Sequence, residues 1–595
     1  MEIIQALRKI NQKTAFYNID YYRPNHEELL AYFKTNQFDV VGISAVVSTA
    51  YSYTKYLSQT IKLVSPGTKI VVGGNLAASA EILLRKSSVD FCVIGNGEFI
   101  IKDLVNTLAQ KNWNFEQMQQ IQGICFLDSD DKFHFTGFRK APRPKEMVFP
   151  DYEILEADGS ISYYIEDTPG WYIQYGMEIP EDMRGKKNGI IQIAKGCANR
   201  CTFCHRWEKG YRFRPLDKIK EHIKLLKTKY NVGFLSIADE SFGTNRRLTL
   251  ELAKFLHEMK IIWRSNAVRT SSIDKETLFH WKSHGCRAVT FGIESGSQTI
   301  LDVMEKNTKV QTNINALKWC YDAGLATSVQ LILGMPGETD RTVNETIEFL
   351  KECLPYYPLS FRGYLNMVNS INYAQALPGS PLYEYARHCG FIGQTIDEEE
   401  EYLKKISDTD ASNTEHYVNC THSPRLKVFS WQPYLTGKIN AYYIQKLFNV
   451  NLSFIDATLN LSFLLLRAFM RKIGLNSKTF AVPLEKKLAG QLKAPQKGNI
   501  VFNNELSLFT TIFLNNLAGK LFSPFLLFIA IPIKRSNSIW KAFGLVFEFI
   551  TRKVMSPFKF KPTDPSRSLR KLFKIKPPHS PEEGNEKMLP IRYGR

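Results

Sequence analysis

The chain is organised around an apolar run and the cysteine-rich loop that follows it, GIIQIAKGCANRCTFCH at residues 189–205. The run at 189–194 has the continuous apolar pattern of a buried strand. The loop then places three thiols, Cys197, Cys201 and Cys204, at the spacing C-x-x-x-C-x-x-C. Such a tight loop points three thiolates at one small inorganic group, and cysteine thiolates are the usual ligands of iron–sulfur clusters. A 4Fe-4S cluster with three such ligands keeps one iron open, and an open iron is a place for chemistry.

Zinc and a disulfide are the alternatives for these thiols. A structural zinc site needs four protein ligands, and His205, adjacent to Cys204, is badly placed to complete the tetrahedron. A disulfide would use only two of the three thiols. No signal peptide is visible at residues 1–5, so we expect a cytoplasmic location in which thiols stay reduced. The remaining seven cysteines show no disulfide framework: Cys92, Cys125, Cys286, Cys320, Cys353, Cys389 and Cys420.

The loop, including the aromatic Phe203 before the last cysteine, resembles the signature of the radical S-adenosylmethionine (radical SAM) superfamily. The resemblance implies that the open iron chelates the amino and carboxylate groups of SAM. One electron from the cluster then cleaves SAM to methionine and a 5′-deoxyadenosyl radical, which abstracts a hydrogen from the substrate. The cofactors carry this chemistry, and the protein supplies position and exclusion of solvent.

Residues 1–140 have the alternating pattern of a Rossmann-like, doubly wound parallel sheet. Ligands of such sheets bind at the carboxyl ends of the strands, where this sequence has glycine turns. The arrangement resembles the radical SAM subgroup with an N-terminal cobalamin-binding domain. The resemblance implies that these turns line the corrinoid and its nucleotide tail: Gly73, Gly74, Gly95, Gly97 and Glu98. The expected strands are 38–44, 68–75 and 90–94, and the expected helices are 25–35, 50–64 and 77–86.

One feature of the cobalamin subgroup is missing. The Asp-x-His-x-x-Gly segment, whose histidine ligates cobalt, does not occur, and His26 is the only histidine in the first 130 residues. We therefore predict that no histidine of this domain ligates the cobalt. A degenerate domain that binds no corrinoid stays open as an alternative, because glycine turns are generic.

Residues 185–390 read as a run of βα units, which predicts a partial (β/α)6 barrel of the TIM type behind a linker at 141–184. The functional groups of such barrels gather at the carboxyl ends of the strands. The family resemblance places SAM-binding residues there: Asp239, Glu240, Arg269, Gly292, Glu294, Ser295 and Glu338. Residues 377–383 resemble a closing segment of the subgroup. The alternative for Asp239, Ser295 and Glu338 is helix capping, because each precedes a predicted helix.

The positive charge belongs to the C-terminal region. Residues 421–595 hold 28 Lys and Arg against 8 Asp and Glu, whereas the first 420 residues hold 49 against 50. We expect a mainly helical, basic and apolar region at 391–555 and a disordered tail at 556–595. The acidic run 398–401 predicts a solvated helix start. Because the excess charge lies outside the catalytic part, no nucleic-acid partner is expected.

Apolar blocks at 461–466 and 521–533 adjoin Lys and Arg residues. They are shorter than the roughly 20 apolar residues that span a bilayer. Apolar segments with adjacent basic residues suit the surface of an anionic membrane, and the alternative is a helical cap on the barrel.

These features predict a cobalamin-dependent radical SAM enzyme that methylates an unactivated carbon. Radical cyclisation or carbon–carbon coupling of a lipid is the competing reaction, and an iron–sulfur membrane-associated sensor is the competing non-enzymatic function. Methylthiolation usually brings a second cysteine cluster, which the sequence lacks. The expected partners are a small-molecule or lipid substrate, an electron donor such as flavodoxin or ferredoxin, and a membrane surface.

Overall fold

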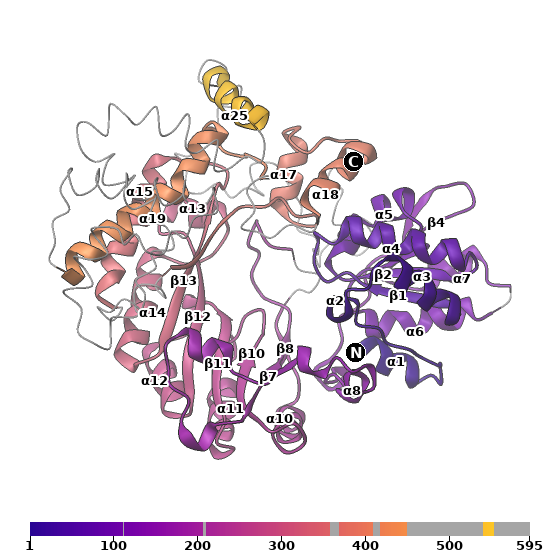
Figure 1. Ribbon diagram of the computed structural model, residues 1–595, viewed down its shortest axis with the longest axis horizontal. Helices are drawn as coiled ribbons and strands as arrows, with labels where there is room; N and C mark the ends of the chain where they lie inside the picture. The colour runs from indigo at the N-terminus through magenta and orange to yellow at the C-terminus, as the bar shows by residue number, and fades with distance from the viewer. Residues whose placement is uncertain (111, 206–209, 357–367, 408–416, 449–538, 553–595) are drawn as a thin grey trace, which may run out of the picture.

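The computed structural model describes the chain except residues 111, 206–209, 357–367, 408–416, 449–538 and 553–595. Two α/β bodies lie side by side, with the N-terminal body at the right of the view and the larger barrel body at the left (Figure 1). The apolar blocks at 461–466 and 521–533 and the tail from 556 lie outside the described residues.

The N-terminal body is a five-stranded sheet with the order β1-β2-β3-β4-β5. The first three strands are parallel, β4 pairs antiparallel with β3, and β4 and β5 form an antiparallel hairpin. Successive side chains of a strand point to opposite faces. Ile70 and Val72 therefore pack against one set of helices, and Val71 packs against the other. The strands are β1 (Val40–Ser44), β2 (Lys69–Gly73), β3 (Phe91–Val93), β4 (Ile124–Leu127) and β5 (Phe133–Phe135).

Helices cover both faces of this sheet, which confirms the Rossmann-like prediction. One face carries α3 (His26–Thr35), α4 (Tyr51–Val64) and α5 (Ala80–Lys86). The other carries α1 (Glu2–Arg8), α6 (Gly97–Leu108) and α7 (Phe115–Gln120). The short helix α2 (Ile19–Tyr22) lies between α1 and α3 in the chain.

The larger body is a seven-stranded sheet with the order β14-β13-β12-β11-β10-β7-β6. Six of its strands are parallel, which confirms the predicted partial barrel. The parallel strands are β7 (Lys187–Ile191), β10 (Val232–Ile237), β11 (Ile262–Val268), β12 (Cys286–Glu294), β13 (Ala326–Leu333) and β14 (Val368–Tyr373). The helices between and after them are α10 (Leu216–Tyr230), α11 (Arg246–Glu258), α12 (Lys275–Ser283), α13 (Gln298–Val303), α14 (Val310–Ala323) and α15 (Asp340–Cys353).

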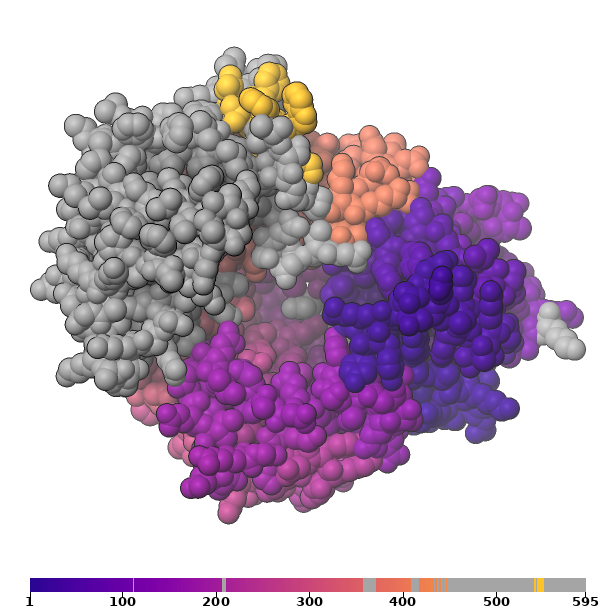
Figure 2. All heavy atoms as spheres, viewed as in Figure 1, coloured from indigo at the N-terminus to yellow at the C-terminus, as the bar shows by residue number. Residues whose placement is uncertain are grey.

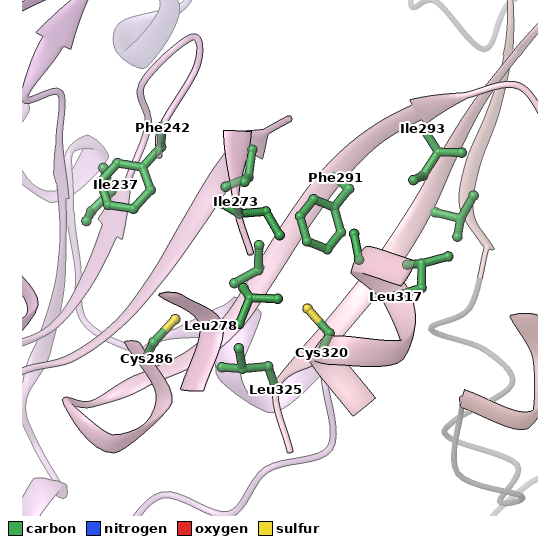
Figure 3. Packing of buried hydrophobic residues seen from close by; sticks show 14 of the residues in the cluster. Ile237, Phe242, Ile273, Leu278, Cys286, Phe291, Ile293, Leu317, Cys320 and Leu325 are labelled. Carbon is green, nitrogen blue, oxygen red and sulfur yellow. The ribbon is translucent and has the colours of Figure 1, made fainter. Parts of the chain in front are cut away.

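Apolar side chains fill the space between the barrel strands and their helices. Phe291 and Ile293 of β12 face Leu317 and Cys320 of α14 in the same cluster (Figure 3). Both cysteines labelled in this view, Cys286 and Cys320, are fully buried. Burial raises the pKa of each of these thiols, so they act as small apolar core residues.

The segment 141–184, predicted as a linker, contributes to the barrel sheet. Its strand β6 (Ile165–Glu166) pairs antiparallel with β7 and forms the edge of the sheet. Trp171 is buried and donates a hydrogen bond to Asn188 of β7 at 3.0 Å. The segment also contains α8 (Glu153–Asp158) and α9 (Gly170–Gln174).

Helices α17 (Pro381–His388) and α18 (Ile396–Ile406) follow the last barrel strand and pack on the N-terminal body. The prediction that the acidic run 398–401 is solvated is wrong for two of its members. Glu399 and Glu400 are 1% and 6% exposed. Glu400 accepts a hydrogen bond from Tyr51 at 2.8 Å and pairs with Lys55 at 2.6 Å. A buried carboxylate is stable when it is paired in this way, and both partners come from helix α4.

The described part of the C-terminal region is helical, with α19 (Arg425–Phe448) packed against α15 and α25 (Ile539–Arg552) packed against α19. Helix α25 lies at the periphery of the molecule, and its side chains are visible at the surface in Figure 2. Among the described helices, none combines the length and the apolar character needed to cross a bilayer.

Candidate functional site

The cysteine loop connects two short strands beyond the end of β7. Strand β8 (Ala194–Lys195) pairs antiparallel with β9 (Arg212–Phe213), and the three cysteines lie between them. Cys201 is buried, while Cys197 and Cys204 are half-buried, and none of the three forms a disulfide. The two-stranded ribbon of β8 and β9 therefore holds a loop of reduced thiols at the carboxyl end of the barrel sheet.

Asp239, which follows β10, fixes the base of this loop. Its Oδ1 accepts hydrogen bonds from the backbone N–H groups of Ile193 at 2.8 Å and Ala194 at 3.2 Å. Its Oδ2 accepts one from the Tyr211 hydroxyl at 2.9 Å, so the carboxylate ties both strands of the ribbon together. Burial raises the pKa of Asp239 to about 6, although these three donors oppose the rise. The family resemblance implied that Asp239 binds SAM, whereas its hydrogen bonds in the structure are with residues on both sides of the cysteine loop.

The tip of the loop is held from the opposite side. The N–H of Thr202 donates to the carbonyl of Met304 at 2.9 Å, and its hydroxyl donates to Val303 at 3.0 Å. Leu382, in the first turn of α17, donates its N–H to the carbonyl of Thr202 at 2.9 Å. This contact brings the predicted closing segment, residues 377–383, onto the cysteine loop.

Two N–H donors point at the sulfur atoms. Arg269, after β11, donates to Cys201 Sγ at 3.6 Å, and Asn199 Nδ2 donates to Cys197 Sγ at 3.4 Å. Hydrogen bonds to the ligating sulfur atoms are a common feature of iron–sulfur sites. The donor set therefore fits a thiolate-ligated cluster.

The described residues contain no group of three His, Cys, Asp or Glu side chains placed to hold a single metal ion. A cluster does not require that geometry, because each thiolate binds a different iron.

Strand β12 ends in an irregularity that redirects Glu294. The pairing with β13 shifts register between Gly292 and Glu294, and Glu294 has a φ of 66°. Bulges near active sites commonly re-aim a side chain, and a left-handed non-glycine residue is held there by its surroundings. Glu294 Oε1 pairs with Lys306 Nζ at 2.8 Å, and a Cβ on Gly292 would lie 2.5 Å from that same carboxylate oxygen.

Lys306 links this carboxylate to the cysteine loop. Its ammonium lies 5.8 Å from the centre of the Phe203 ring, within cation–π range. Its carbonyl accepts a hydrogen bond from Arg269, the residue that also donates to Cys201. Arg269, Glu294 and Lys306 therefore form one connected group beside the thiols, and two of them were predicted.

The capping alternative for Asp239, Ser295 and Glu338 is not what the structure shows. The helices that follow them begin at other caps, Asn245, Ser297 and Thr339. Ser295 is buried and accepts from the N–H of Ser297 at 3.1 Å. Glu240, next to Asp239, is half-buried.

Glu338 is a buried carboxyl group in the turn after β13. Its Oε2 accepts a hydrogen bond from the N–H of Gly334, whose carbonyl accepts one from the Tyr417 hydroxyl at 2.8 Å. Burial raises the pKa of Glu338 from 4.5 to about 8. The unfolded carboxyl ionises near 4.5, so between this value and about 8 the folded state binds more protons. The unfolding free energy must then fall as pH rises through this window.

We expect Glu338→Gln to remove this pH dependence. The amide keeps the acceptor for Gly334 and carries no charge, so the variant should be more stable than the parent at pH 8 by on the order of 3 kcal/mol. The two proteins should converge near pH 4.5. Melting temperatures measured across this range check the result, with Glu398→Gln as a control, because backbone hydrogen bonds lower the pKa of Glu398 below the window. Parallel pH profiles for the parent and Glu338→Gln would contradict the assignment.

The carboxyl edge of the N-terminal sheet is open at two of the predicted glycines. A Cβ on Gly73 or Gly95 would meet no atom within 4 Å, so a ligand has room to approach the backbone there. Gly74 has a φ of 91°, and a Cβ on it would lie 2.3 Å from the carbonyl oxygen of Ala45. Gly97 packs against Ile3 of α1. Gly73 and Gly95 therefore face open space, whereas Gly74 and Gly97 allow close packing.

Glu98 lies on the same edge, in the first turn of α6, but its Oε1 is bonded to Lys195 Nζ at 2.7 Å. The predicted corrinoid contact is thus a residue that reaches the barrel body. The apolar surface at this edge comes from Val46 and Val47, which follow β1 and are 64% and 57% exposed.

Sequence reasoning missed four groups of this site: Val46 with Val47, Asn199, Tyr211 and Lys306. Asn199 lies within the quoted loop and had a positional signal. Tyr211 and Lys306 lie 28 and 12 residues from the carboxylates they contact, and nothing in the pattern indicated these pairs.

Comparisons with known proteins agree with this arrangement. The family model "Radical SAM superfamily" matches residues 191–350, and the model "B12 binding domain" matches residues 3–105. The first match contains the cysteine loop and the barrel strands β10 to β13, and the second contains the three parallel strands β1 to β3 of the N-terminal sheet. The cofactors of the radical SAM domain are a 4Fe-4S cluster and SAM, and the cofactor of the B12-binding domain is cobalamin.

Curated relatives include cyclases, methyltransferases and tRNA methylthio synthases. The chain is 28% identical over 334 residues to an anaerobic magnesium-protoporphyrin IX monomethyl ester cyclase of Cereibacter sphaeroides, covering 54% of this chain and 50% of that one. It is 23% identical to a cytidylyl-2-hydroxyethylphosphonate methyltransferase of Streptomyces wedmorensis, covering 53% and 62%. The matched part spans about half the length of the cyclase.

Among solved structures, the fold resembles the cobalamin-dependent S-adenosylmethionine radical enzyme OxsB. The apo form gives a TM-score of 0.56 at 14% identity, covering 96% of this chain and 80% of that one. The form with aqua-cobalamin bound gives 0.51 at 15% identity, covering 89% and 73%. Residues 191–350 of the chain therefore form a radical SAM domain, and residues 3–105 ahead of it form a B12-binding domain.

Proposed function

We propose that this protein is a cobalamin-dependent radical SAM methyltransferase that acts on an unactivated carbon of a small-molecule or lipid substrate. The observation that supports this most directly is the contact between the two cofactor-binding bodies. The glycine edge of the N-terminal sheet is joined to the base of the cysteine loop through Glu98 and Lys195. When bound, the cluster with SAM supplies one-electron cleavage of SAM, and the corrinoid supplies a methyl group.

The residues divide this work between them. Cys197, Cys201 and Cys204 would hold the cluster, and Arg269 would stabilise the ligating thiolate of Cys201. Glu294 and Lys306 provide a carboxylate and an ammonium beside the loop, a pair whose charges match the amino and carboxylate groups of SAM. Gly73 and Gly95 leave room for the corrinoid.

Isotope labelling tests the proposal without knowledge of the substrate. The reconstituted, reduced protein with hydroxocobalamin should receive SAM that carries a deuterated methyl group. A methyltransferase should yield S-adenosylhomocysteine and a labelled methyl group recovered on the corrinoid. A protein that forms neither S-adenosylhomocysteine nor 5′-deoxyadenosine, even with candidate substrates, would contradict the enzymatic function and favour the sensor.

Radical cyclisation is the second candidate, because the cyclase of Cereibacter sphaeroides is 28% identical over the matched region. The same experiment separates the two reactions. A cyclase should form 5′-deoxyadenosine with its substrate and transfer no label to the corrinoid. An electron donor such as flavodoxin or ferredoxin is proposed for either reaction, in a cytoplasmic and reducing setting.

Helix α25 supports a further partner, the surface of an anionic membrane. Trp540, Phe543, Phe547 and Ile550 are between 57% and 81% exposed and recur at helical spacing along one side of the helix. The region from 421 onward carries an excess of 20 basic residues. Aromatic side chains on a helix with nearby Lys and Arg suit the interface of anionic lipids.

We expect the double variant Phe543→Ser/Phe547→Ser to weaken vesicle binding. The parent should sediment with vesicles that contain anionic phosphatidylglycerol and much less with phosphatidylcholine alone. Loss of two large apolar side chains should reduce the affinity on the order of tenfold. The control is Phe279→Ser/Tyr321→Ser, which removes two aromatic side chains of the barrel that are 41% and 50% exposed. Equal sedimentation of all three proteins would contradict this contact.

A further inference from the structure

A cluster of four charged residues joins the N-terminal body to both ends of the cysteine loop. Lys195, at the end of β8, binds Glu2 Oε2 at 2.6 Å and Glu98 Oε1 at 2.7 Å. Arg214, directly after β9, binds Glu2 Oε1 at 2.7 Å. The two basic residues flank the loop, and the two acidic residues belong to helices α1 and α6 of the B12-binding domain.

The network is shielded from water. The side chains of Arg214, Glu98 and Lys195 are 1%, 10% and 14% exposed, and that of Glu2 is 22% exposed. Burial disfavours the charge on Lys195, but Glu98 and Glu2 outweigh it and raise the pKa of this lysine. Ion pairs at this depth are weakly screened, so each charge depends on its partners.

Arg214 fixes the network to the barrel. Its Nη1 donates to the carbonyl of Gln192 at 2.5 Å, its Nε donates to Val148 at 3.1 Å, and its guanidinium lies 4.7 Å from the centre of the Phe149 ring. An arginine held by three such contacts has one orientation. Glu2 is therefore bound to a rigid group on one side and to the more adaptable Lys195 on the other.

Glu98 lies between the glycine turns of the N-terminal sheet and the cysteine loop. It lies in the first turn of α6, just after Gly95 and Gly97 at the carboxyl edge of the sheet, and its partner Lys195 is two residues before Cys197. A shift of the loop relative to the sheet edge must stretch this pair.

We propose that Glu2, Glu98, Lys195 and Arg214 act as positioning residues that hold the cluster loop at one fixed distance from the corrinoid edge. The proposal rests on the proposed function only in requiring that both cofactors bind. Methyl transfer through two cofactors needs fixed geometry between them, and these ion pairs connect the two ends of the loop directly to the N-terminal body. The network makes the B12-binding domain part of the support of the cysteine loop.

Pulsed electron paramagnetic resonance on the full-length protein tests this proposal directly. With the cluster reduced and the cobalt as Co(II), the distance distribution between the two paramagnetic centres should be narrow in the parent. Lys195→Gln and the isosteric Glu98→Gln should each broaden it. Lys195→Arg keeps a positive charge within reach of both carboxylates and should restore the narrow distribution.

Hydrogen exchange provides a second readout that needs no cofactor. Peptides covering 192–214 should exchange on the order of tenfold faster in Lys195→Gln and Glu98→Gln. Peptides of β10 to β13 should keep the parent rate. The matched control is Lys62→Gln, which removes an ion pair of 2.9 Å with Asp90 inside the N-terminal body.

Unchanged distance distributions and unchanged exchange in both variants would overturn the proposal. Faster exchange spread over the whole barrel would also overturn it, because it would show a general loss of stability. Since neither readout measures methyl transfer, a parent that binds both cofactors but transfers no methyl group would refute the proposed function and leave this test intact.

Discussion

Replacement of Cys197, Cys201 or Cys204 by alanine is expected to abolish both iron binding and SAM cleavage. Two thiolates cannot hold a cluster that relies on three, and the described residues offer no other cysteine within the loop. Reconstituted variants should contain iron and sulfide only at background level. They should lack the brown chromophore and form no detectable 5′-deoxyadenosine. The effect should be close to complete for each position, because the three ligands act as a unit.

A matched control is Cys389→Ala. Its thiol is half-buried like those of Cys197 and Cys204, but it lies at the end of α17. This variant should keep iron, colour and turnover at the parent level. Iron and sulfide analysis should be paired with a thermal melt, so that misfolding is recognised. A loop variant that keeps its colour and still cleaves SAM would remove the basis of the cluster assignment.

The second large effect is expected at Asp239. Asp239→Ala leaves two backbone N–H groups and the Tyr211 hydroxyl without their acceptor. Unsatisfied buried donors cost roughly 1–3 kcal/mol each, so with partial entry of water the loss should be on the order of 3 kcal/mol. Because these donors lie at the start of β8 and directly before β9, on both sides of the cysteine loop, the loss should appear as early release of iron as well as a lower melting temperature.

Asp239→Asn separates this structural role from a direct contact with SAM. The amide oxygen keeps both backbone hydrogen bonds, and the amide N–H₂ can donate to the Tyr211 oxygen. The cost should stay below about 1.5 kcal/mol, with iron retained. A residue that binds the amino group of SAM through its charge would instead lose SAM affinity in this variant without loss of stability.

A further control is Asp274→Ala, which removes the N-cap of α12. It should cost about 1 kcal/mol and leave iron retention unchanged. If Asp239→Ala and Asp274→Ala behave alike, the carboxylate of Asp239 is not what supports the cysteine loop.

Local patterns predicted the elements of both bodies. The helix expected at 50–64 is α4 (Tyr51–Val64), and the strand expected at 68–75 contains β2 (Lys69–Gly73). Such segments follow from hydrophobic periodicity and turn residues, which are properties of neighbours in the chain. The cysteine loop could be recognised for the same reason, since its three thiols fall within eight residues.

Contacts between distant residues could not be predicted in this way. Glu400 reads as a surface residue of an acidic run, yet Tyr51 and Lys55, about 350 positions away, bury and pair it. Glu98 reads as a ligand residue of its own domain, yet it binds Lys195 in the next one. In both cases the sequence shows which charged residue is present, but the residue that pairs with it depends on how the domains pack.

The sequence by itself predicted the order of the elements, the two α/β bodies and the three thiols. Each of these features depends on the spacing of residues that are close together in the chain. The depth of Asp239 and Glu338, the meeting of Glu294 with Lys306 and the ionic link across the domains depended on folding. The burial and the partners of these charged side chains determine what each one does. Both depend on segments that are far apart in the sequence and meet only in the folded protein.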